Sequence, residues 1–528
     1  MIDQPYPASG TPSTSLWDVF TGRATAHPDR EAVVHGPFRC TYGGLREQAE
    51  RTAAGLEALG VRAGDRVGML SYPRPEVVAV YLACARLGAI FLGIGTRVNE
   101  KELDYILTDA TPSVLVTVER FEGTQFGALV DRAAERHDIQ AVVHLGDEPG
   151  GPLPFEGVPA LSVARPVDPD APLSIVYTSG TTGDPKGAVV THRGILTFSA
   201  LLRHTPVEAP RILSLMPIDH IGGQGNEVVS AILSGGTLVQ LPRFDAGGAL
   251  TAIEQEKVTL WQGVIQTMLN RLMAHDRFET ADLGSLERLW WVGPLPVSLA
   301  ERLAARIPVV GASYGMTEVG CITMTDRDIT PADATRTVGK PLDDIDIRIE
   351  PIPGHRPGEP GEILVRRNPL MQGYWRKPEK TAEAITPTGW LRTGDLGYFD
   401  DSGNLVLAGR SKLLIRSGGY NISPMEIEQI VENHPGIQLA AVAAVPDPDL
   451  GEAAHMLAIP APGHAPTEDD VKTFLRERLS SYKIPKSVRF CDRIPLLANS
   501  KLDRRGVQQM LGPKAATTAP VPSQEDSQ

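Results

Sequence analysis

Cysteine and positive charge are both scarce in this chain of 528 residues. Its four cysteines lie far apart and form no CxxC pair, which argues against a zinc site and against a disulfide framework. Lysine and arginine number 51 against 64 acidic residues, and the formal net charge of −13 offers no general attraction to nucleic acid or anionic lipid. We therefore expect neither a nucleic acid nor a membrane among the partners of this protein.

Long hydrophobic runs and targeting features are missing as well. The apolar stretch AVYLACARLGAIFLGI is interrupted by Arg86 and Gly88, and no uncharged window reaches the length needed to span a bilayer. The first fifteen residues lack the basic and apolar regions of a secretory signal peptide. These absences predict a cytoplasmic protein.

The composition that remains is that of a globular protein with more than one hydrophobic core. Hydrophobic residues make up 42% of the chain and charged residues 22%, which excludes a disordered or fibrous protein. A length of 528 residues exceeds the size at which one core usually stops growing, so we expect two or more domains.

Helical and strand-like segments alternate along most of the chain. Residues 45–60 have the helical spacing of apolar residues and end at a glycine, and residues 64–71 form a short apolar run typical of a buried strand. Similar strand-like runs follow at 141–146, 173–180, 211–217, 235–242 and 288–293. This alternation predicts an α/β fold whose large N-terminal domain consists of doubly wound βαβ sheets.

The character of the sequence changes twice toward the C-terminus. After about residue 343, short strands between Gly and Pro turns predict a small β-rich subdomain. After residue 409 the pattern becomes that of a small α+β unit, short enough to be a mobile cap. We expect a large domain at 1–409, a small C-terminal domain at 410–512 and a polar, disordered tail at 513–528.

The segment YTSGTTGDPKG at 177–187 follows one of the apolar strands and carries the features of a phosphate loop. Glycines let backbone N–H groups approach phosphate oxygens, hydroxyls add donors, and a lysine adds positive charge. The alternative is an ordinary flexible Ser/Thr/Gly surface loop, and the spacing differs from that of a Walker A loop. We predict that a polyphosphate is held by Thr178, Ser179, Gly180, Thr181, Thr182, Gly183 and Lys186.

This loop resembles, nearly letter for letter, the signature of the adenylate-forming superfamily. The superfamily includes acyl- and aryl-CoA synthetases, adenylation domains of peptide synthetases, and beetle luciferases. Further motifs follow in the same order, from GASYGMTE at 311–318 through GWLRTGDLG at 389–397 to the lysine at 501. The resemblance implies binding of ATP and Mg²⁺ and the activation of a carboxylic acid.

The motif at 311–318 is similar to the second nucleotide motif of the superfamily. A carboxylate next to a polyphosphate is repelled unless a cation lies between them, so the resemblance implies Glu318 as the Mg²⁺ ligand. It also implies that Thr317 donates to the α-phosphate. The remaining nucleotide contacts implied by it are Gly311, Ala312, Ser313 and Tyr314, with Tyr314 covering the adenine. Taken alone, the motif could equally be a β-turn with a surface glutamate.

Later motifs imply the ribose contacts, the hinge and the thiol tunnel. Asp395 matches the aspartate that accepts from both ribose hydroxyls, and Arg410 would contact the ribose or phosphate. Lys412 falls at the hinge position between the two domains. Gly418 and Gly419 match the loop where a glycine backbone leaves room for a pantetheine arm. Without the resemblance, Arg410 and Lys412 would be a solvated basic turn.

Lys501 aligns with the catalytic lysine of the superfamily, which bridges the substrate carboxylate and the α-phosphate as negative charge builds up. Ser500 stands where the family usually has glycine, so the conformation of this loop departs from the common pattern. By itself, a lysine in a basic stretch is normally only solvated.

The acid pocket is predicted from two further segments. His220 falls where the superfamily places the residue that guards the acid, although a lone histidine could equally be a core residue. Ile221, Gly222 and Gly223 are expected to leave space for the substrate. Trp291 and Gly293 stand where the family has small residues, so we expect a cavity for a compact or aromatic acid. Because Trp290 and Trp291 alternate along one strand, at least one should face the core.

Together these features predict an AMP-forming acid–thiol ligase that makes an acyl-adenylate and transfers the acyl group to coenzyme A. The alternative is a stand-alone adenylating enzyme whose acceptor is the phosphopantetheine of a separate carrier protein or another small nucleophile. A nucleotide-binding regulator without catalysis is disfavoured, because Glu318, Asp395 and Lys501 are all present. The partners are then a carboxylic acid, ATP and CoA, in a monomer or homodimer.

Overall fold

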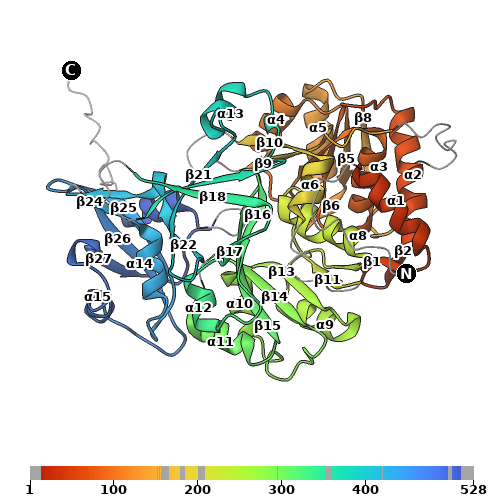
Figure 1. The fold of residues 1–528 in the computed structure, drawn as a ribbon. Coiled ribbons are helices and arrows are strands. Elements are labelled where there is room, and N and C mark those ends of the chain that lie inside the picture. The colour runs from red at the N-terminus through yellow and green to blue at the C-terminus, as the bar shows by residue number, and fades with distance from the viewer. Residues whose placement is uncertain are drawn as a thin grey trace, which may run out of the picture. The chain divides into compact units, whose positions relative to one another are not determined.

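The computed structural model describes residues 14–151, 153, 155, 166–178, 185–199, 209–293, 295–352, 360–418, 420–496 and 502–512. These residues form two compact units. The first comprises the described residues up to Thr393 together with Gly397–Leu407, and the second comprises Gly394–Leu396 and the described residues from Ala408 onward. Figure 1 shows the chain from red at the N-terminus to blue at the C-terminus.

The largest sheet of the first unit has nine strands, in the spatial order β17-β16-β15-β14-β13-β11-β12-β1-β2. The strands from β15 to β1 are parallel to their neighbours, whereas β2, β16 and β17 are antiparallel. The bounds in that spatial order are Lys340–Pro341, Gly320–Met324, Val309–Met316, Arg288–Val292, Leu260–Ile265, Arg211–Ser214, Thr237–Gln240, Glu31–His35 and Phe38–Thr41.

A second sheet of seven strands has the order β20-β10-β9-β4-β3-β5-β8. The strands from β9 to β8 run parallel, and β10 and β20 are added antiparallel at one edge. The bounds in that order are Gly373–Tyr374, Lys186–Thr191, Pro172–Thr178, Ile90–Ile94, Arg66–Leu70, Val114–Val118 and Ala141–Leu145. The small pair β6 (Arg120–Phe121) and β7 (Thr124–Gln125) lies between β5 and the next helix.

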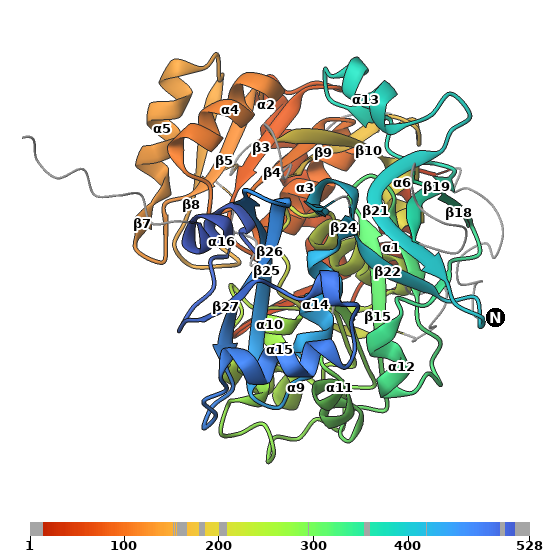
Figure 2. The same ribbon diagram turned by 90° about the vertical axis from the view of Figure 1, so that its left-hand side faces the viewer.

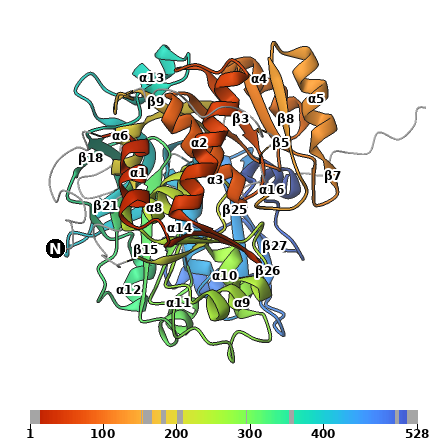
Figure 3. The same cartoon turned by 90° about the vertical axis from the view of Figure 1, so that its right-hand side faces the viewer.

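Helices connect and cover these sheets. Figure 3 shows α2 and α3 side by side, and α3 contacts β3 and β4. Figure 2 shows α5 beside β5 and β8, which it contacts. The helices of this unit are α1 (Leu16–Ala26), α2 (Tyr42–Ala58), α3 (Pro75–Leu87), α4 (Glu100–Ala110), α5 (Phe126–Arg136), α6 (His192–Phe198), the π-helix η1 (Gly222–Val229), α8 (Ser230–Ser234), α9 (Ala246–Glu256), α10 (Gln266–Met273), α11 (Val297–Ala304), α12 (Pro331–Arg336) and α13 (Pro378–Ala384).

The helix α3 shows how the sequence specifies these elements. Pro75 occupies its first turn, where a missing N–H costs nothing, and Gly88 ends it in the left-handed region at φ 68°. The strand β4 follows at once and is buried along its whole length. A helix that is apolar nearly all round and a strand buried on both faces are what a covered parallel sheet requires.

A smaller four-stranded sheet has the order β18-β19-β21-β22, with bounds Ile345–Glu350, Gly361–Arg367, Leu391–Phe399 and Leu405–Arg410. The second unit contains a five-stranded sheet in which β27 (Ser487–Phe490) joins the path β24-β23-β26-β25, with bounds Tyr420–Ile422, Ile415–Ser417, Gly451–Pro460 and Ile437–Asp447. Its helices are α14 (Pro424–Val431), α15 (Glu468–Arg476) and α16 (Arg504–Leu511), with short 3-10 turns at Ser411–Leu413 and Ser481–Lys483. The predicted α/β fold, with a large sheet domain and a C-terminal domain, is confirmed.

The nine-stranded sheet is buried on both faces. Trp290 belongs to the hydrophobic cluster that also includes residues of α1–α3, whereas Trp291 belongs to a second cluster with residues of α9, α10 and α11. Neighbouring residues of β14 therefore serve two different cores. Among the residues that the structure describes, no helix combines the length and apolar character needed to cross a bilayer.

Candidate functional site

Several predicted site residues follow strands that end at the same edge of the nine-stranded sheet. His220 lies in the connection after β11, Gly293 follows β14, and Thr317 and Glu318 form the turn between β15 and β16. Since β11, β13, β14 and β15 are parallel, their carboxyl ends share one edge, where ligands of open α/β sheets bind. This edge is the candidate site.

The predicted phosphate loop is the connection of a β-hairpin in the seven-stranded sheet. Thr178 at the end of β9 pairs with Lys186 at the start of β10, and the Thr178 hydroxyl donates to the Lys186 carbonyl at 3.3 Å. The hairpin fixes where the loop leaves and returns. Ser179, Gly180, Thr181, Thr182 and Gly183 lie outside the described residues.

The base of this hairpin is fastened to α4. The Tyr177 hydroxyl donates to the Asp109 carboxylate at 2.6 Å, and the Tyr105 hydroxyl donates to the Pro185 carbonyl at 2.8 Å. Burial, followed by the neighbouring Asp109 carboxylate, raises the pKa of Tyr177, which keeps its hydroxyl a donor. The two ends of the loop are thus held from one side by a single helix.

Lys186, Tyr374 and Glu318 come together beside the hairpin, although they are distant in sequence. The Lys186 ammonium lies 4.7 Å from the centre of the Tyr374 ring, and the Tyr374 hydroxyl donates to Glu318 Oε1 at 2.7 Å. Glu318 is only 6% exposed, and burial together with this carboxylate raises the pKa of Tyr374. Sequence reasoning found Lys186 and Glu318 but missed Tyr374, because nothing in the local pattern of MQGYWRKPE marks it.

The segment that precedes Glu318 is buried within the strand β15. Gly311, Ala312, Ser313 and Tyr314 are all buried in β15, and Thr317 is 8% exposed. A Cβ added at Gly311 would lie 2.1 Å from the Thr325 hydroxyl oxygen and 3.2 Å from the Trp290 indole nitrogen. Glycine is therefore required here by the packing of the strand itself.

The loop that carries His220 is held by the π-helix that follows it. The buried Glu227 carboxylate accepts from the Ser214 hydroxyl at 2.8 Å and from the backbone N–H groups of Leu215 and Met216 at 3.1 and 3.0 Å. Gln224 donates to the Ile218 carbonyl at 2.8 Å. Burial raises the pKa of Glu227 to about 8. One helix thus holds both the beginning and the middle of the loop.

Gly222 and Gly223 make room for this loop. A Cβ on Gly223 would lie 2.3 Å from the Pro217 carbonyl oxygen, and one on Gly222 would lie 2.5 Å from the Met216 sulfur. These two glycines are therefore required by the packing of their own loop, and the substrate space predicted beside them stays a prediction. His220 itself is exposed, and its Nδ1 accepts from the Gly222 N–H at 3.0 Å, while Ile221 is buried.

The end of β14 differs from the expectation for a pocket floor. Trp291 is 1% exposed and packs in the core, so it lines no open space and does not narrow a cavity. The reason is that both faces of this central sheet are covered. Val292 is 40% exposed, and a Cβ on Gly293, whose φ is +88°, would meet nothing within 4 Å. These two residues, rather than Trp291, present the strand end to open space.

In the second unit the structure pairs two of the predicted nucleotide residues. Arg410 Nε lies 2.7 Å from Asp395 Oδ1, and Asp395 is 5% exposed. This ion pair orients the Asp395 carboxylate. Lys412 is exposed in a short 3-10 turn, and Gly418 has a φ of +56°, which favours glycine. Gly419 and Lys501 lie outside the described residues.

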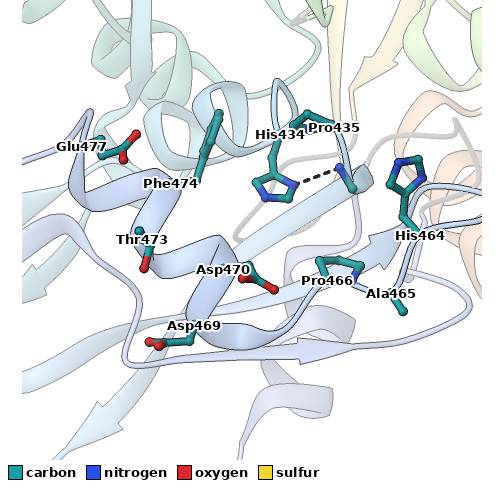
Figure 4. A pocket seen from close by; sticks show the side chains of 11 residues that line it. His434, Pro435, His464, Ala465, Pro466, Asp469, Asp470, Thr473, Phe474 and Glu477 are labelled. Carbon is teal, nitrogen blue, oxygen red and sulfur yellow. Dashed lines mark hydrogen bonds between the residues drawn. The ribbon is translucent and has the colours of Figure 1, made fainter.

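The second unit contains a hollow of about 560 Å³ that is separate from the predicted site residues. None of the predicted site residues lines it, and Asp470 at its wall is engaged in capping α15 through Thr467. Its lining residues, shown in Figure 4, are His434, Pro435, Gly436, His464, Ala465, Pro466, Asp469, Asp470, Thr473, Phe474 and Glu477. We do not assign ATP or the acid to this hollow.

Comparison with known proteins identifies the family. The model of the AMP-binding enzyme family matches residues 20–375, and that of the AMP-binding enzyme C-terminal domain matches residues 426–501. The chain belongs to the AMP-binding enzyme family. Within this family it is 37% identical over 499 residues to a feruloyl-CoA synthase of Amycolatopsis sp, covering 93% of this chain and 98% of that one.

Two further family members cover almost the whole chain. Indoleacetate–CoA ligase of Aromatoleum aromaticum is 35% identical over 506 residues, covering 93% of this chain and 97% of the relative. The solved structure of ATP-bound MatB from Rhodopseudomonas palustris superimposes with a TM-score of 0.84 at 28% identity, covering 94% and 98% of the two chains. The predicted superfamily and enzyme class, an AMP-forming acid–CoA ligase that uses ATP and CoA, are confirmed.

Proposed function

We propose that this AMP-binding enzyme adenylates a compact aromatic carboxylic acid with ATP and Mg²⁺ and then transfers the acyl group to the thiol of coenzyme A. The observation that carries the proposal is the assembly of Lys186, Tyr374 and Glu318 at the base of the phosphate hairpin. A cation and a carboxylate held this way beside a hairpin loop suit a polyphosphate and its metal ion.

In the first step the substrate carboxylate attacks the α-phosphorus of ATP and pyrophosphate leaves. Lys186 offsets charge on the phosphates, and Thr317 donates to the α-phosphate. Lys501 bridges the carboxylate and the phosphate as negative charge accumulates in the transition state. Asp395, oriented by its ion pair with Arg410, holds the ribose hydroxyls. The roles of these residues are proposals that rest on the family motifs and on the contacts described above.

The residues beside the hairpin fit a magnesium ion. Mg²⁺ is usually held by one or two carboxylates together with substrate phosphates and waters, so a single glutamate suffices. Tyr374 occupies one oxygen of Glu318 and leaves Oε2 for the metal. When bound, the ion neutralises charge on the phosphates and on the leaving pyrophosphate.

In the second step the CoA thiol attacks the acyl carbonyl and AMP leaves. We propose that the small domain turns about Lys412, which withdraws Lys501 and brings Gly418 and Gly419 to line the pantetheine path. The predicted domain limits at 1–409 and 410–512 stay predictions, and the division into two compact units near residue 408 supports them. The cytoplasmic location and the monomeric or dimeric state also stay predictions.

The choice of an aromatic acid now has a different basis from the one the sequence offered. Trp291 no longer supports it, because that side chain is in the core. Support comes from the relatives, whose names specify feruloyl and indoleacetyl groups. A panel of cinnamates, benzoates, indoleacetate and palmitate, scored by ATP–pyrophosphate exchange, tests it. Turnover of palmitate without turnover of any aromatic acid would refute this acid class.

The acceptor is tested separately with the best acid. CoA, a pantetheinylated carrier protein and simple amines are offered to the enzyme, and each product is identified by intact mass. We expect the CoA thioester. Acylation of the carrier protein or of an amine, with CoA left unreacted, would replace CoA as the acceptor and leave the first step standing.

A further inference from the structure

The short segment 371–375 joins the two sheets at the site. Met371 donates its N–H to the Glu318 carbonyl at 3.0 Å, beside the nine-stranded sheet. Three residues later, Tyr374 pairs with Ala188 of β10 in the seven-stranded sheet, and the Trp375 N–H donates to the Gly187 carbonyl at 2.7 Å. One stretch of five residues therefore fixes the backbone of the metal carboxylate relative to the strand that begins with Lys186.

Tyr374 is held rigidly within this segment. Its backbone N–H donates a hydrogen bond to the Thr381 hydroxyl at 2.9 Å. Gly373 before it has a φ of +139°, and a Cβ there would lie 2.8 Å from Thr381 Cγ2 and 2.9 Å from Thr381 Oγ1. The chain turns here in a conformation that favours glycine and packs directly on α13. The direction of the tyrosine ring is thus set by the backbone on both sides.

We propose that Tyr374 is a positioning residue that holds the Glu318 carboxylate for the metal and the Lys186 ammonium for the phosphates. Its hydroxyl occupies Glu318 Oε1, and its ring face receives the lysine at 4.7 Å. A lysine and a glutamate brought to one place attract each other, and a direct ion pair would reduce the charge that each offers to ATP and Mg²⁺. Tyr374 offers its hydroxyl to the Glu318 carboxylate and its ring face to the Lys186 ammonium.

The chemistry of the contact suits this task. A hydrogen bond from a hydroxyl to an ionised carboxylate is stronger than one between neutral groups, and it fixes the carboxylate rotamer without consuming its charge. The Lys186 ammonium is attracted to the ring face by the ring's quadrupole, which holds the lysine beside the hairpin.

The proposal rests on the assignment of Glu318 as the metal ligand, and its test measures metal binding directly. Tyr374→Phe removes only the hydroxyl and keeps the ring over Lys186. Mg²⁺ is titrated by calorimetry into protein saturated with α,β-methylene-ATP. We expect about tenfold weaker Mg²⁺ binding, the effect of losing one hydrogen bond to a charged group, with binding of the metal-free nucleotide unchanged. Tyr374→Leu, which also removes the ring, should weaken the binding of the metal-free nucleotide as well.

Tyr81→Phe is the matched control. The Tyr81 hydroxyl is buried without a hydrogen-bond partner among the described residues, so its removal should leave Mg²⁺ binding at the wild-type value. A double-mutant cycle with Glu318→Gln then separates positioning from general destabilisation. The loss caused by Tyr374→Phe should disappear in the Glu318→Gln background. Additive losses, or wild-type Mg²⁺ binding by Tyr374→Phe, would overturn the proposal.

Failure of this inference is distinguishable from failure of the proposed function. Wild-type protein that supports no pyrophosphate exchange with any acid contradicts the proposed function. If wild-type protein exchanges pyrophosphate and binds Mg²⁺, and the Tyr374→Phe variant does both equally well, only the proposed role of Tyr374 is contradicted.

Discussion

The nucleotide end and the acid end of the candidate site are fixed by different kinds of contact. At the nucleotide end, Lys186, Glu318 and Tyr374 come from three segments far apart in sequence and from two different sheets. At the acid end, the loop before His220 is held by Glu227 and Gln224 of the helix that directly follows it. The first arrangement joins distant segments, whereas the hydrogen bonds of the second lie within about fifteen consecutive residues.

The residues that we propose act on ATP are therefore fixed differently from the loop that we propose recognises the acid. Residues that act on ATP are locked by long-range packing, so a change there disturbs more than one element. The predicted acid loop carries several hydrogen-bond partners of its own, so we expect a change there to disturb fewer distant elements. We expect substitutions at the two ends to have different consequences, and the following experiments examine that expectation.

The largest effect is expected at Lys501, for which we propose a role at the nucleotide end. Lys501→Ala should lower pyrophosphate exchange by about 10²–10³-fold, because it removes the charge that stabilises the transition state of the first step. A supplied acyl-adenylate should still be converted to the CoA thioester. Equal loss of both half-reactions would contradict the proposed division of labour.

A somewhat smaller loss is expected at Glu318. Glu318→Gln keeps the shape but removes the charge that faces the metal, and we expect about 100-fold lower kcat/KM for ATP, or about 2.7 kcal/mol. The KM for the acid should stay within twofold. Glu379→Gln in α13, which is exposed, is the control and should behave as wild type. An acid KM that rises as much as the ATP KM would mean that the two ends are not independent.

The acid end should respond to Gly223→Ala. The new Cβ would lie 2.3 Å from the Pro217 carbonyl, so the loop must move. We expect a loss of about 1–3 kcal/mol in the free energy of unfolding and a several-fold higher KM for the acid, with the ATP KM unchanged. Gly22→Ala in α1 has open space around the new atom and is the control. Urea unfolding and separate titrations of the two substrates measure these effects.

The smallest effect is a pH dependence of stability from Glu227. Burial raises its pKa from 4.5 in the unfolded chain to about 8, so between these values the folded protein holds a proton that the unfolded chain has lost. Stability from this group is therefore complete below pH 4.5 and is lost as the pH rises toward 8. Glu227→Gln should flatten this decline, because the glutamine has no proton to lose in this range.

Melting temperatures at pH 5 and pH 8 measure the effect of Glu227. The difference in melting temperature between wild type and Glu227→Gln should be larger at pH 5 than at pH 8. Glu301→Gln, an exposed position on α11, should show the wild-type slope. A gap that is constant with pH would mean that the Glu227 carboxyl does not change its protonation in this range.

Much of the fold could be predicted from the sequence, because alternating helices and buried strands leave a strong local pattern. The predicted strands at 64–71, 141–146 and 211–217 correspond to β3, β8 and β11. The family motifs also placed Lys186 and Glu318. Local patterns say little about pairing between distant segments, however, and Tyr374 joins β10 about 185 residues after the strand it pairs with.

The surroundings of Trp291 and Gly222 differ from what their residue types suggest, for a common physical reason. Trp291 was assigned to a pocket and Gly222 to an open space, yet the first fills a core and the second accommodates a methionine. In both cases the sequence shows the size of a residue but not which neighbour occupies the adjacent volume. A sheet covered on both faces buries consecutive residues, so alternation along the strand does not separate core from pocket.

The self-contained acid loop has a practical consequence for engineering. Residues 214–227 begin and end on the same set of hydrogen bonds, with Ser214 at one end and Glu227 at the other. Exchange of this segment between related ligases would test whether it sets the acid preference. A graft that transfers the loop without Glu227 would leave two backbone N–H groups unpaired in the interior, so the whole segment must move together.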